Sequence, residues 1–595
     1  MSSRACDACR SRKVRVSTRD RPFACSSSTS NPALFFPASV TASLLLRKIT
    51  PAFTAAHLDR RSRRMRPSPL GDHDDASVLS TSASPVSLAD TPAYERQVVT
   101  RGPRSPTNAN DSVPLSSGAT DLNHKIENIH QDLVRSISGI PDSYWSLDAI
   151  VERCASIYMD VLFGIRPVVS EARIRANICL KPPRLGANLG VLSCSSRPLI
   201  SSAKPEDLEE IRSYTLVTAL CAATAYMLST ENDPKGAVVG PIFLHASHEM
   251  LHIYEDLDVE YPDSTSLIIR AFQAGALHTD GKLRLSWHLF SAALRLGEQM
   301  QLQDPRSFQG LDPLEARLRV MAFRIIRISA RYHRMLENHP LGICDPAWSA
   351  LPYLDAGPEP TLMVNPSPRS FPQGYESQLL IAFNLFEKLW VAASDILTDL
   401  ECFVRLGLRG APIIATLAES LQNHFLDPYS SFIGLLDHLP PFLHSPDSVK
   451  HPDQAITEIM RRQFWIQRAN LFVSYHCLRM LILNRFAQHG LATMIGVQST
   501  ETMIALRKTE IAHDMNVFVI NAPIDSLLVN GEACVTKIRY MGATLLEVIH
   551  QIQAPQVVKR ANSLFSSLLD VLTKLDSRAS DELVSEGHAV TAPIF

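Results

Sequence analysis

The sequence predicts an all-α protein in which one large helical domain follows a short basic segment and a linker. The chain has 595 residues, too many for one ordinary core, and its 45% of hydrophobic residues is typical of globular proteins. From residue 121 to 576, apolar residues recur at helical spacing, and no run of alternating β-branched residues competes with them. We therefore expect helices throughout this part of the chain.

Charge divides the chain into a basic N-terminal arm and a mildly acidic remainder. Residues 1–70 contain 14 Lys or Arg and 3 Asp or Glu, whereas the whole chain has a net charge of −2. The arm therefore carries +11 and the remainder −13. This asymmetry favours a polyanionic partner such as DNA.

A linker is predicted over residues 26–120, basic at first and then rich in Ser and Pro. Residues 67–118 contain 24 Ser, Thr, Pro or Gly among 52 positions. Because such a composition cannot bury a core, we expect this part to be disordered. A flexible tail is predicted at residues 577–595.

Residues 121–137 carry the first helical pattern, with apolar residues at spacings of four, three and four: Leu122, Ile126, Ile129 and Leu133. The pattern fits a short coiled coil, which would make a homodimer, and it also fits an amphipathic helix that lies on the body. We favour the second interpretation, because stable coiled coils usually sustain three or more heptads.

The helical domain is predicted to span residues 138–576, with Pro340 ending one of its helices. Its long helices are expected near residues 206–229, 237–257, 282–304, 314–343, 376–406, 455–486, 498–518 and 523–552. The longest apolar stretch, residues 216–228, is shorter than the ~20 residues that span a bilayer. There is no secretory signal, and the 11 cysteines are scattered. We expect a soluble, intracellular protein without a membrane partner.

A Cys-x2-Cys pair, Cys6 and Cys9, lies within the basic arm. Two thiolates at this spacing can chelate one ion, and structural zinc prefers four ligands. The segment CDACRSRKVR continues directly into a run of basic residues: Arg10, Arg12, Lys13 and Arg15. On a helix that follows the metal, such side chains can neutralise phosphates and reach guanine edges.

This segment resembles the first half of a fungal binuclear zinc-cluster transcription factor. In that family, two Cys-x2-Cys-x6-Cys halves hold two zinc ions. The resemblance implies that Cys6 and Cys9 are zinc ligands and that Lys13 contacts bases. It implies that the flanking arginines contact phosphates or support the helix, and that the DNA site contains CGG triplets. Cys25 is the only further candidate zinc ligand before Cys154.

The body resembles the helical middle region of the same regulators over roughly residues 140–420, chiefly at 286–304 and 314–343. Matching positions are Trp287, Asp304, Glu315, Arg319, Phe323, Arg331 and Pro340. The resemblance implies a non-enzymatic regulator of RNA polymerase II transcription in the nucleus, with co-regulator proteins as partners. Regulators of this type control secondary-metabolite or nutrient-use genes. The run RRSRRMR at 60–66 suits a nuclear localisation signal.

Val16 stands where the third cysteine of the family falls. One interpretation is a helical interaction protein that has lost DNA binding. Another is that the messenger RNA is spliced after Arg15, because Val-Ser can be encoded by GTAAGT or GTGAGT, which are typical intron starts. The apolar segment 32–49 would then be translated intron.

A remote alternative is a zinc hydrolase. His248, Glu249 and His252 form an H-E-x-x-H motif on a predicted helix, where two histidines share one face and the glutamate activates water. A hydrolase of this type needs a third ligand, and the following residues IYEDLDVEY contain no histidine. The motif therefore fits a chance pair of histidines better.

Overall fold

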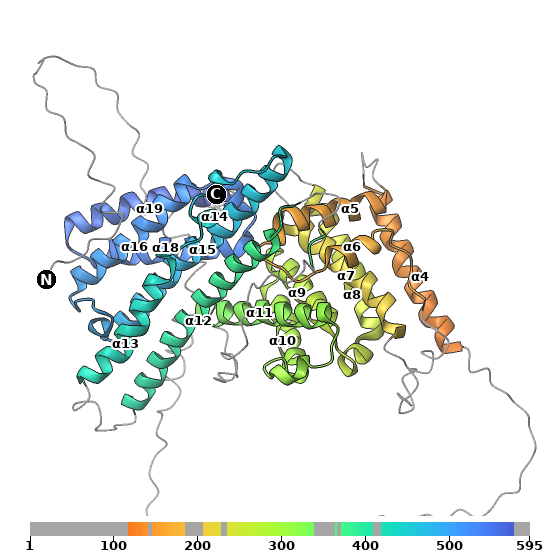
Figure 1. Cartoon of the computed structure of the whole chain (residues 1–595). Helices are drawn as coiled ribbons and strands as arrows, with labels where there is room; N and C mark the ends of the chain where they lie inside the picture. The colour runs from red at the N-terminus through yellow and green to blue at the C-terminus, as the bar shows by residue number, and fades with distance from the viewer. Residues whose placement is uncertain are drawn as a thin grey trace, which may run out of the picture. The chain divides into compact units, whose positions relative to one another are not determined.

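A computed structural model describes residues 117–140, 146–184, 206–227, 235–337, 363–365, 371–408 and 418–575. Within these residues every regular element is a helix and none is a strand, so the predicted all-α class is confirmed (Figure 1). The predicted zinc segment, nearly all of the linker and the tail at 577–595 lie outside the described residues.

The first elements of the body form what we call the N-terminal helix group. In chain order they are α4 (Ser117–Ser138), α5 (Leu147–Ile157), the π-helix η1 (Tyr158–Leu162), α6 (Glu171–Ala176), α7 (Glu206–Met227), α8 (Lys235–Glu260), α9 (Ser264–Thr279), α10 (Leu283–Gln299), η4 (Pro305–Phe308) and α11 (Pro313–Leu336). Helix α7 packs on both α8 and α9, and α10 packs on α9.

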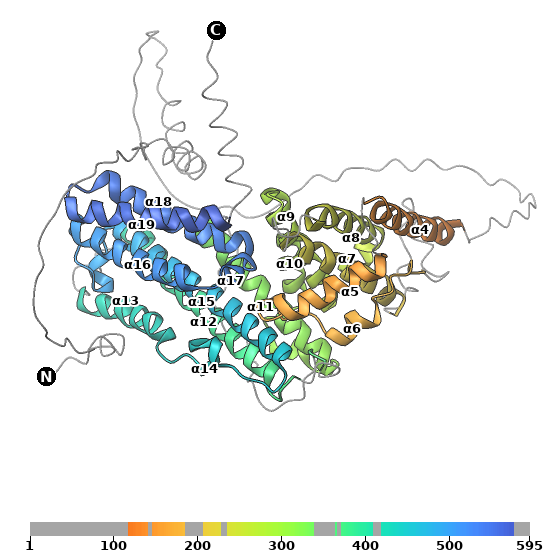
Figure 2. The same cartoon turned by 90° about the horizontal axis from the view of Figure 1, so that it is seen from above.

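The remaining elements form the C-terminal helix group. They are α12 (Tyr375–Leu408), α13 (Ala418–Ile433), η7 (Gly434–Leu436), α14 (Pro441–His444), η8 (Pro446–Ser448), α15 (Gln454–Gln488), η9 (Ala492–Ile495), α16 (Glu501–Asn521), α17 (Ile524–Leu528), α18 (Gly531–Gln551) and α19 (Pro555–Leu575). Helix α15 is central, because α12, α16 and α18 all pack on it (Figures 1 and 2). The two groups share one hydrophobic core.

Short polar side chains fix where several helices begin. At α9, the Ser266 amide donates to Asp263 Oδ1 at 3.1 Å, and the Asp263 amide donates to Ser266 Oγ at 3.1 Å. This capping box satisfies two amides that a helix start leaves without partners. Asp312 caps α11 in a related way, and Pro313 follows it at the first helical position, where no amide is needed.

Helix α4 begins at Ser117, within the predicted linker, and it packs on α8. Ile126 and Leu133 are buried in these contacts, and Leu122 and Ile129 pack against the same core. The apolar stripe of residues 121–137 therefore lies on the body of its own chain.

Two predicted helices were wrong in their extent. The helix expected at 523–552 is two helices, because Asn530 and Gly531 interrupt it and Gly531 has a φ of +61°. The helix expected at 314–343 ends earlier, at Leu336, with Glu337 as its C-cap. Pro340, which was expected to end it, lies beyond the last described residue of that segment.

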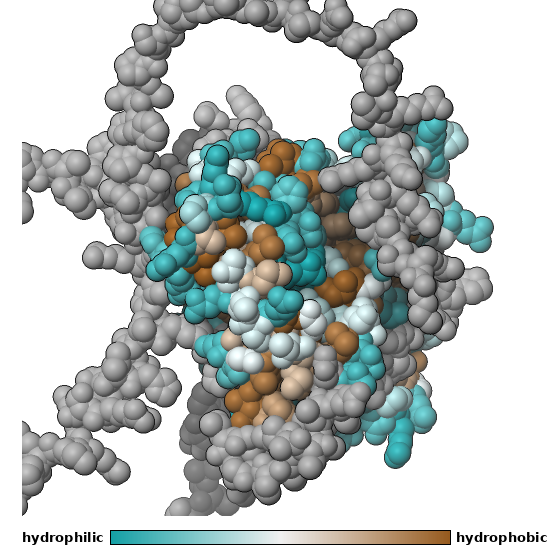
Figure 3. Space-filling model, turned by 90° about the vertical axis from the view of Figure 1, so that its left-hand side faces the viewer, coloured by the Kyte–Doolittle hydropathy of each residue, from teal (hydrophilic) through white to brown (hydrophobic). Residues whose placement is uncertain are grey.

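Among the helices described, none combines the length and the hydrophobicity that crossing a bilayer requires. On the face shown in Figure 3, apolar residues are interspersed with hydrophilic ones. Scattered apolar side chains are ordinary on a folded domain.

Candidate functional site: a cavity between the two helix groups

The site residues expected from the sequence fall into two sets. The first comprises Cys6, Cys9, Arg10, Arg12, Lys13, Arg15 and Cys25, all of which lie outside the described residues. The second is the H-E-x-x-H motif, which the structure places on α8.

The motif on α8 does not form part of a metal site in the described residues. The exposed His252 ring lies 3.2 Å from Glu255 Oε2, and Glu249 is also exposed. Burial lowers the pKa of the half-buried His248. No group of three or more His, Cys, Asp or Glu that could hold a metal ion occurs among the described residues, so the motif has no third ligand there.

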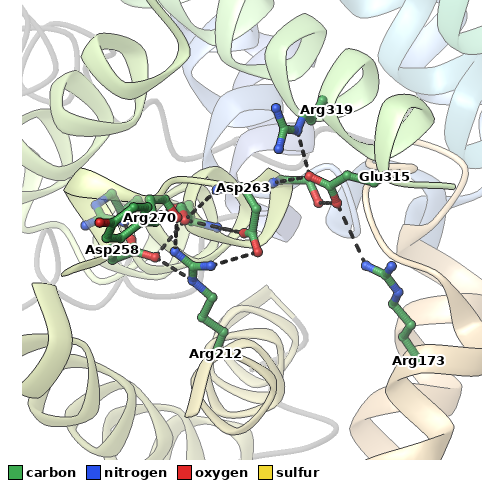
Figure 4. A network of polar contacts seen from close by, with 10 residues as sticks. Arg173, Arg212, Asp258, Asp263, Arg270, Glu315 and Arg319 are labelled. Atoms are coloured by element: carbon green, nitrogen blue, oxygen red, sulfur yellow. Dashed lines mark hydrogen bonds and ion pairs between the residues drawn. The ribbon is translucent and has the colours of Figure 1, made fainter. Parts of the chain in front are cut away.

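A buried network of charges joins α7, α8 and α9 (Figure 4). Asp258 is its centre, with Oδ1 2.8 Å from Arg212 Nε and Oδ2 2.5 Å from Arg270 Nη1. Arg212 also pairs with Asp263 at 3.0 Å and donates to the Tyr261 carbonyl. Each guanidinium here has a carboxylate close by, which offsets the cost of taking its charge out of water.

Glu315 extends this network to α11 (Figure 4). Its carboxylate accepts from the Ser264 amide at 2.9 Å and the Ser264 hydroxyl at 2.7 Å, and it pairs with Arg319 at 2.7 Å. Burial alone would raise the pKa of Glu315, but these hydrogen bonds lower it overall. The network thus fastens the start of α9 to its neighbours.

A cavity of about 180 Å³ lies where the two helix groups meet. Its lining comes from α9, α10 and α11 on one side and from α12, α15 and α18 on the other. Every lining residue is buried or half-buried. The large aromatic side chains of its wall are Phe272, Phe290, Tyr332, Phe383, Phe386 and Trp390. Such a half-enclosed, mostly apolar space with a few polar groups is typical of small-molecule sites.

Lys537 of α18 lines this cavity and is only 3% exposed. Its Nζ lies 5.4 Å from the Trp390 ring centroid, 5.8 Å from that of Phe386 and 5.9 Å from that of Tyr332. It also donates a long, weak hydrogen bond of 3.5 Å to Asn470 Oδ1. Burial lowers the pKa of Lys537, because the charged amine is poorly solvated there.

The cysteines near Lys537 do not neutralise its charge. Burial raises the pKa of both Cys477 and Cys534 to about 12, so both thiols stay protonated at neutral pH. Glu532 also lines the cavity, but its Oε1 pairs with Arg539 at 2.7 Å. Lys537 has no ion-pair partner within the part of the chain that the structure describes.

Lys537 differs in this respect from the other buried cations of the described residues. Five buried arginines have an Asp or Glu oxygen within 4.0 Å: Arg212, Arg270, Arg324, Arg327 and Arg479. Their partners are Asp258, Glu387 and Asp514. Buried charges in proteins are ordinarily paired in this way. A buried lysine without a carboxylate is the exception that identifies the cavity as a candidate site.

Arg166 brings a second cation to the cavity. The π-helix η1 and the turn after it carry the chain to Arg166, and the Tyr158 hydroxyl donates to the Arg166 carbonyl. A Cβ on Gly275 of α9 would lie 3.0 Å from Arg166 Nη1, so the glycine leaves room for the guanidinium. Burial lowers the pKa of Arg166, and the described residues supply no carboxylate that pairs with it.

Two histidines of the cavity lining share one carboxylate. Glu337 Oε1 lies 3.0 Å from His278 Nε2, and Glu337 Oε2 lies 2.7 Å from His333 Nδ1. Burial alone would raise the pKa of Glu337, but these hydrogen bonds lower it to about 2. The carboxylate is therefore ionised at neutral pH and holds α9 and α11 together at the cavity.

Sequence reasoning missed the cavity residues, although one signal was present. In the sequence CVTKIRYM, Lys537 has the helical spacing of three and four from Cys534 and Met541, both of which are buried. A lysine on the apolar stripe of a helix indicates a buried charge. Arg166 offers no comparable signal, because it lies in an irregular segment after a turn.

No protein-family model, curated protein or solved structure matches the chain.

Proposed function

We propose that the chain is a sequence-specific DNA-binding regulator of transcription by RNA polymerase II, acting in the nucleus. The observation that carries this proposal is the Cys6 and Cys9 pair followed at once by four basic residues. Lys13 would reach base edges in the major groove, and the arginines around it would neutralise phosphates. The +11 charge of the first 70 residues supports such docking on DNA.

The number of thiols in the N-terminal arm limits how many zinc ions it can bind. Cys6, Cys9 and Cys25 are half of the six thiolates that hold two zinc ions in the resembling family. This donor set does not fit a two-zinc cluster, and a single structural zinc ion would need a fourth ligand beside the three thiolates. Zinc would fold the segment and so present the basic residues to DNA.

The helical body would then act as the regulatory part, through co-regulator proteins or an effector. A second candidate is a helical interaction protein that no longer binds DNA. Val16, at the position of an expected thiolate, favours this candidate.

The test is to measure zinc content and gel shifts on CGG-containing duplex DNA with the full chain. We expect about one zinc ion per chain. Cys9→Ala should abolish both zinc and the shift, and Lys13→Ala should keep zinc but weaken DNA binding about tenfold. Matched controls are Cys179→Ala and Lys450→Ala, which change an exposed cysteine and an exposed lysine of the body.

An absence of both zinc and a gel shift would overturn the DNA-binding proposal and leave the interaction protein. Sequencing the transcript across codons 10–120 separates the two explanations of Val16. An intron that starts at this codon would restore a longer zinc segment, whereas an uninterrupted transcript would establish the valine.

A further inference from the structure

We propose that the cavity between the two helix groups binds a small aromatic carboxylic acid, whose carboxylate is held by Lys537 and Arg166. This inference goes beyond the proposed function and depends on no residue of the DNA-binding arm. It rests on two cations, the buried Lys537 and the half-buried Arg166, that line one partly open cavity and have no ion-pair partner among the described residues.

The positive charges of Lys537 and Arg166 in the cavity lining favour an anionic ligand. A cation that is buried without a counter-charge is costly, and a bound carboxylate would supply the charge that the buried Lys537 lacks. The one carboxylate among the lining residues, Glu532, is already paired with Arg539. The two histidines of the lining, His278 and His333, are likewise occupied by Glu337. Lys537 and Arg166 therefore remain as the cations available to a ligand.

An indole N–H adds a further donor. Trp390 lines the cavity and is 1% exposed, and its Nε1 has no hydrogen-bond acceptor among the described residues. Buried donors without acceptors are uncommon in folded proteins. A carboxylate oxygen of a ligand in the cavity would accept a hydrogen bond from Trp390 Nε1. The same carboxylate would supply the counter-charge that Lys537 lacks.

The volume and the aromatic lining of the cavity favour a ligand with one aromatic ring. The cavity measures about 180 Å³, and an engineered apolar cavity of about 150 Å³ in another protein holds benzene. One aromatic ring therefore matches the space. The rings of Phe290, Tyr332 and Trp390 supply apolar surface against which a flat ring can pack.

The absence of a side chain at Gly275 leaves room for the Arg166 guanidinium in the cavity lining. A methyl group at this position would meet Arg166 Nη1 at 3.0 Å, and the guanidinium would have to move by a few tenths of an ångström. Because Gly275 lies inside α9, an alanine at this position would have the higher helix propensity. The glycine thus makes room for Arg166 in the lining at some cost to helix propensity.

The experiment measures benzoate binding to the full chain by calorimetry and by the shift in Tm. Benzyl alcohol serves as the neutral probe of similar size, and benzylammonium as the cationic one. We expect saturable benzoate binding with a rise in Tm, and binding of benzyl alcohol that is at least about tenfold weaker. Benzylammonium should not bind. Equal binding of the acid and the alcohol, or no saturable benzoate binding at millimolar concentration, would overturn the proposal.

Variants then locate the binding in the cavity. Lys537→Met and Arg166→Met should each weaken benzoate binding about tenfold or more. Lys125→Met, the same change at a surface lysine of α4, is the matched control and should leave binding unchanged. Benzoate binding that survives in both cavity variants would show that the acid binds elsewhere and would contradict the assignment.

Two milder variants keep the proposal testable if Lys537→Met does not fold. Trp390→Phe keeps a ring but removes the N–H, and Gly275→Ala displaces the Arg166 guanidinium. Both should fold and both should bind benzoate several-fold more weakly than the wild type. Unchanged affinity in both variants would place the carboxylate away from these groups and would contradict the proposed pose.

Discussion

Arginine and lysine side chains occur along α9 in two contrasting settings. Near the start of the helix, Arg270 shares Asp258 with Arg212, and every guanidinium has a carboxylate partner. Near its end, Gly275 makes room for Arg166 at a cavity that also contains Lys537, and neither cation has an ion pair among the described residues. The paired charges around Asp258 therefore hold helices together, whereas the cations at the cavity can receive an external anion.

The paired setting should be the more sensitive to losing one charge. Asp258→Asn would leave Arg212 and Arg270 without the carboxylate that they share, although Arg212 would keep Asp263. We expect a loss of about 3–5 kcal/mol in the free energy of unfolding, because a buried charge is left uncompensated. Urea unfolding measures this loss.

Asp256→Asn, on the exposed side of the same helix, is the matched control for Asp258→Asn and should change little. A loss no larger than that of the control would show that the network contributes little to the fold.

Glu337 holds two histidines of the cavity lining and should give a pH-dependent stability. Its pKa is about 2 in the folded chain against an ordinary 4.5, so its contribution is complete above pH 4.5. The contribution is lost as the pH falls from about 4.5 to 2. With a side chain that is 17% exposed, the carboxylate should contribute up to about 3 kcal/mol.

Glu337→Gln tests this contribution when unfolding is measured from pH 7 downward. The wild type should be the more stable at neutral pH, and the two curves should converge as the pH approaches 2. Glu255→Gln is the matched control, since Glu255 contacts His252 on the surface. Wild-type and Glu337→Gln curves that stay parallel across this range would contradict a lowered pKa at Glu337.

A substitution at Gly531, which lines the cavity, should change the free energy of unfolding less than the substitutions above. Its φ of +61° is strained for any residue with a Cβ, so Gly531→Ala should cost about 1–2 kcal/mol. Gly434→Ala is the control, because that glycine has an ordinary φ and its nearest contact would be 3.6 Å away. Equal stabilities of the two variants in urea would show that the break before α18 is not fixed by glycine.

The sequence predicts the helices well because their apolar stripes repeat over many residues. It fails where a short turn signal decides, as at Asn530 and Gly531, which break a stretch whose apolar spacing looks continuous. The Asn-Gly pair is a common turn signal that outweighs the periodicity here. Asp258 and Lys537 look alike in a helical pattern, since each is one charge among apolar residues. Only the tertiary packing decides that the first has partners and the second has none.

The most direct measurement is the free energy of unfolding of Lys537→Met without added acid, compared with the wild type at pH 7. Methionine keeps the length of the side chain but removes a buried charge that has no counter-ion among the described residues. We predict that the variant is more stable than the wild type by about 1 kcal/mol while it loses benzoate binding. A variant less stable than the wild type would contradict the account, because Lys537 would then serve the fold itself.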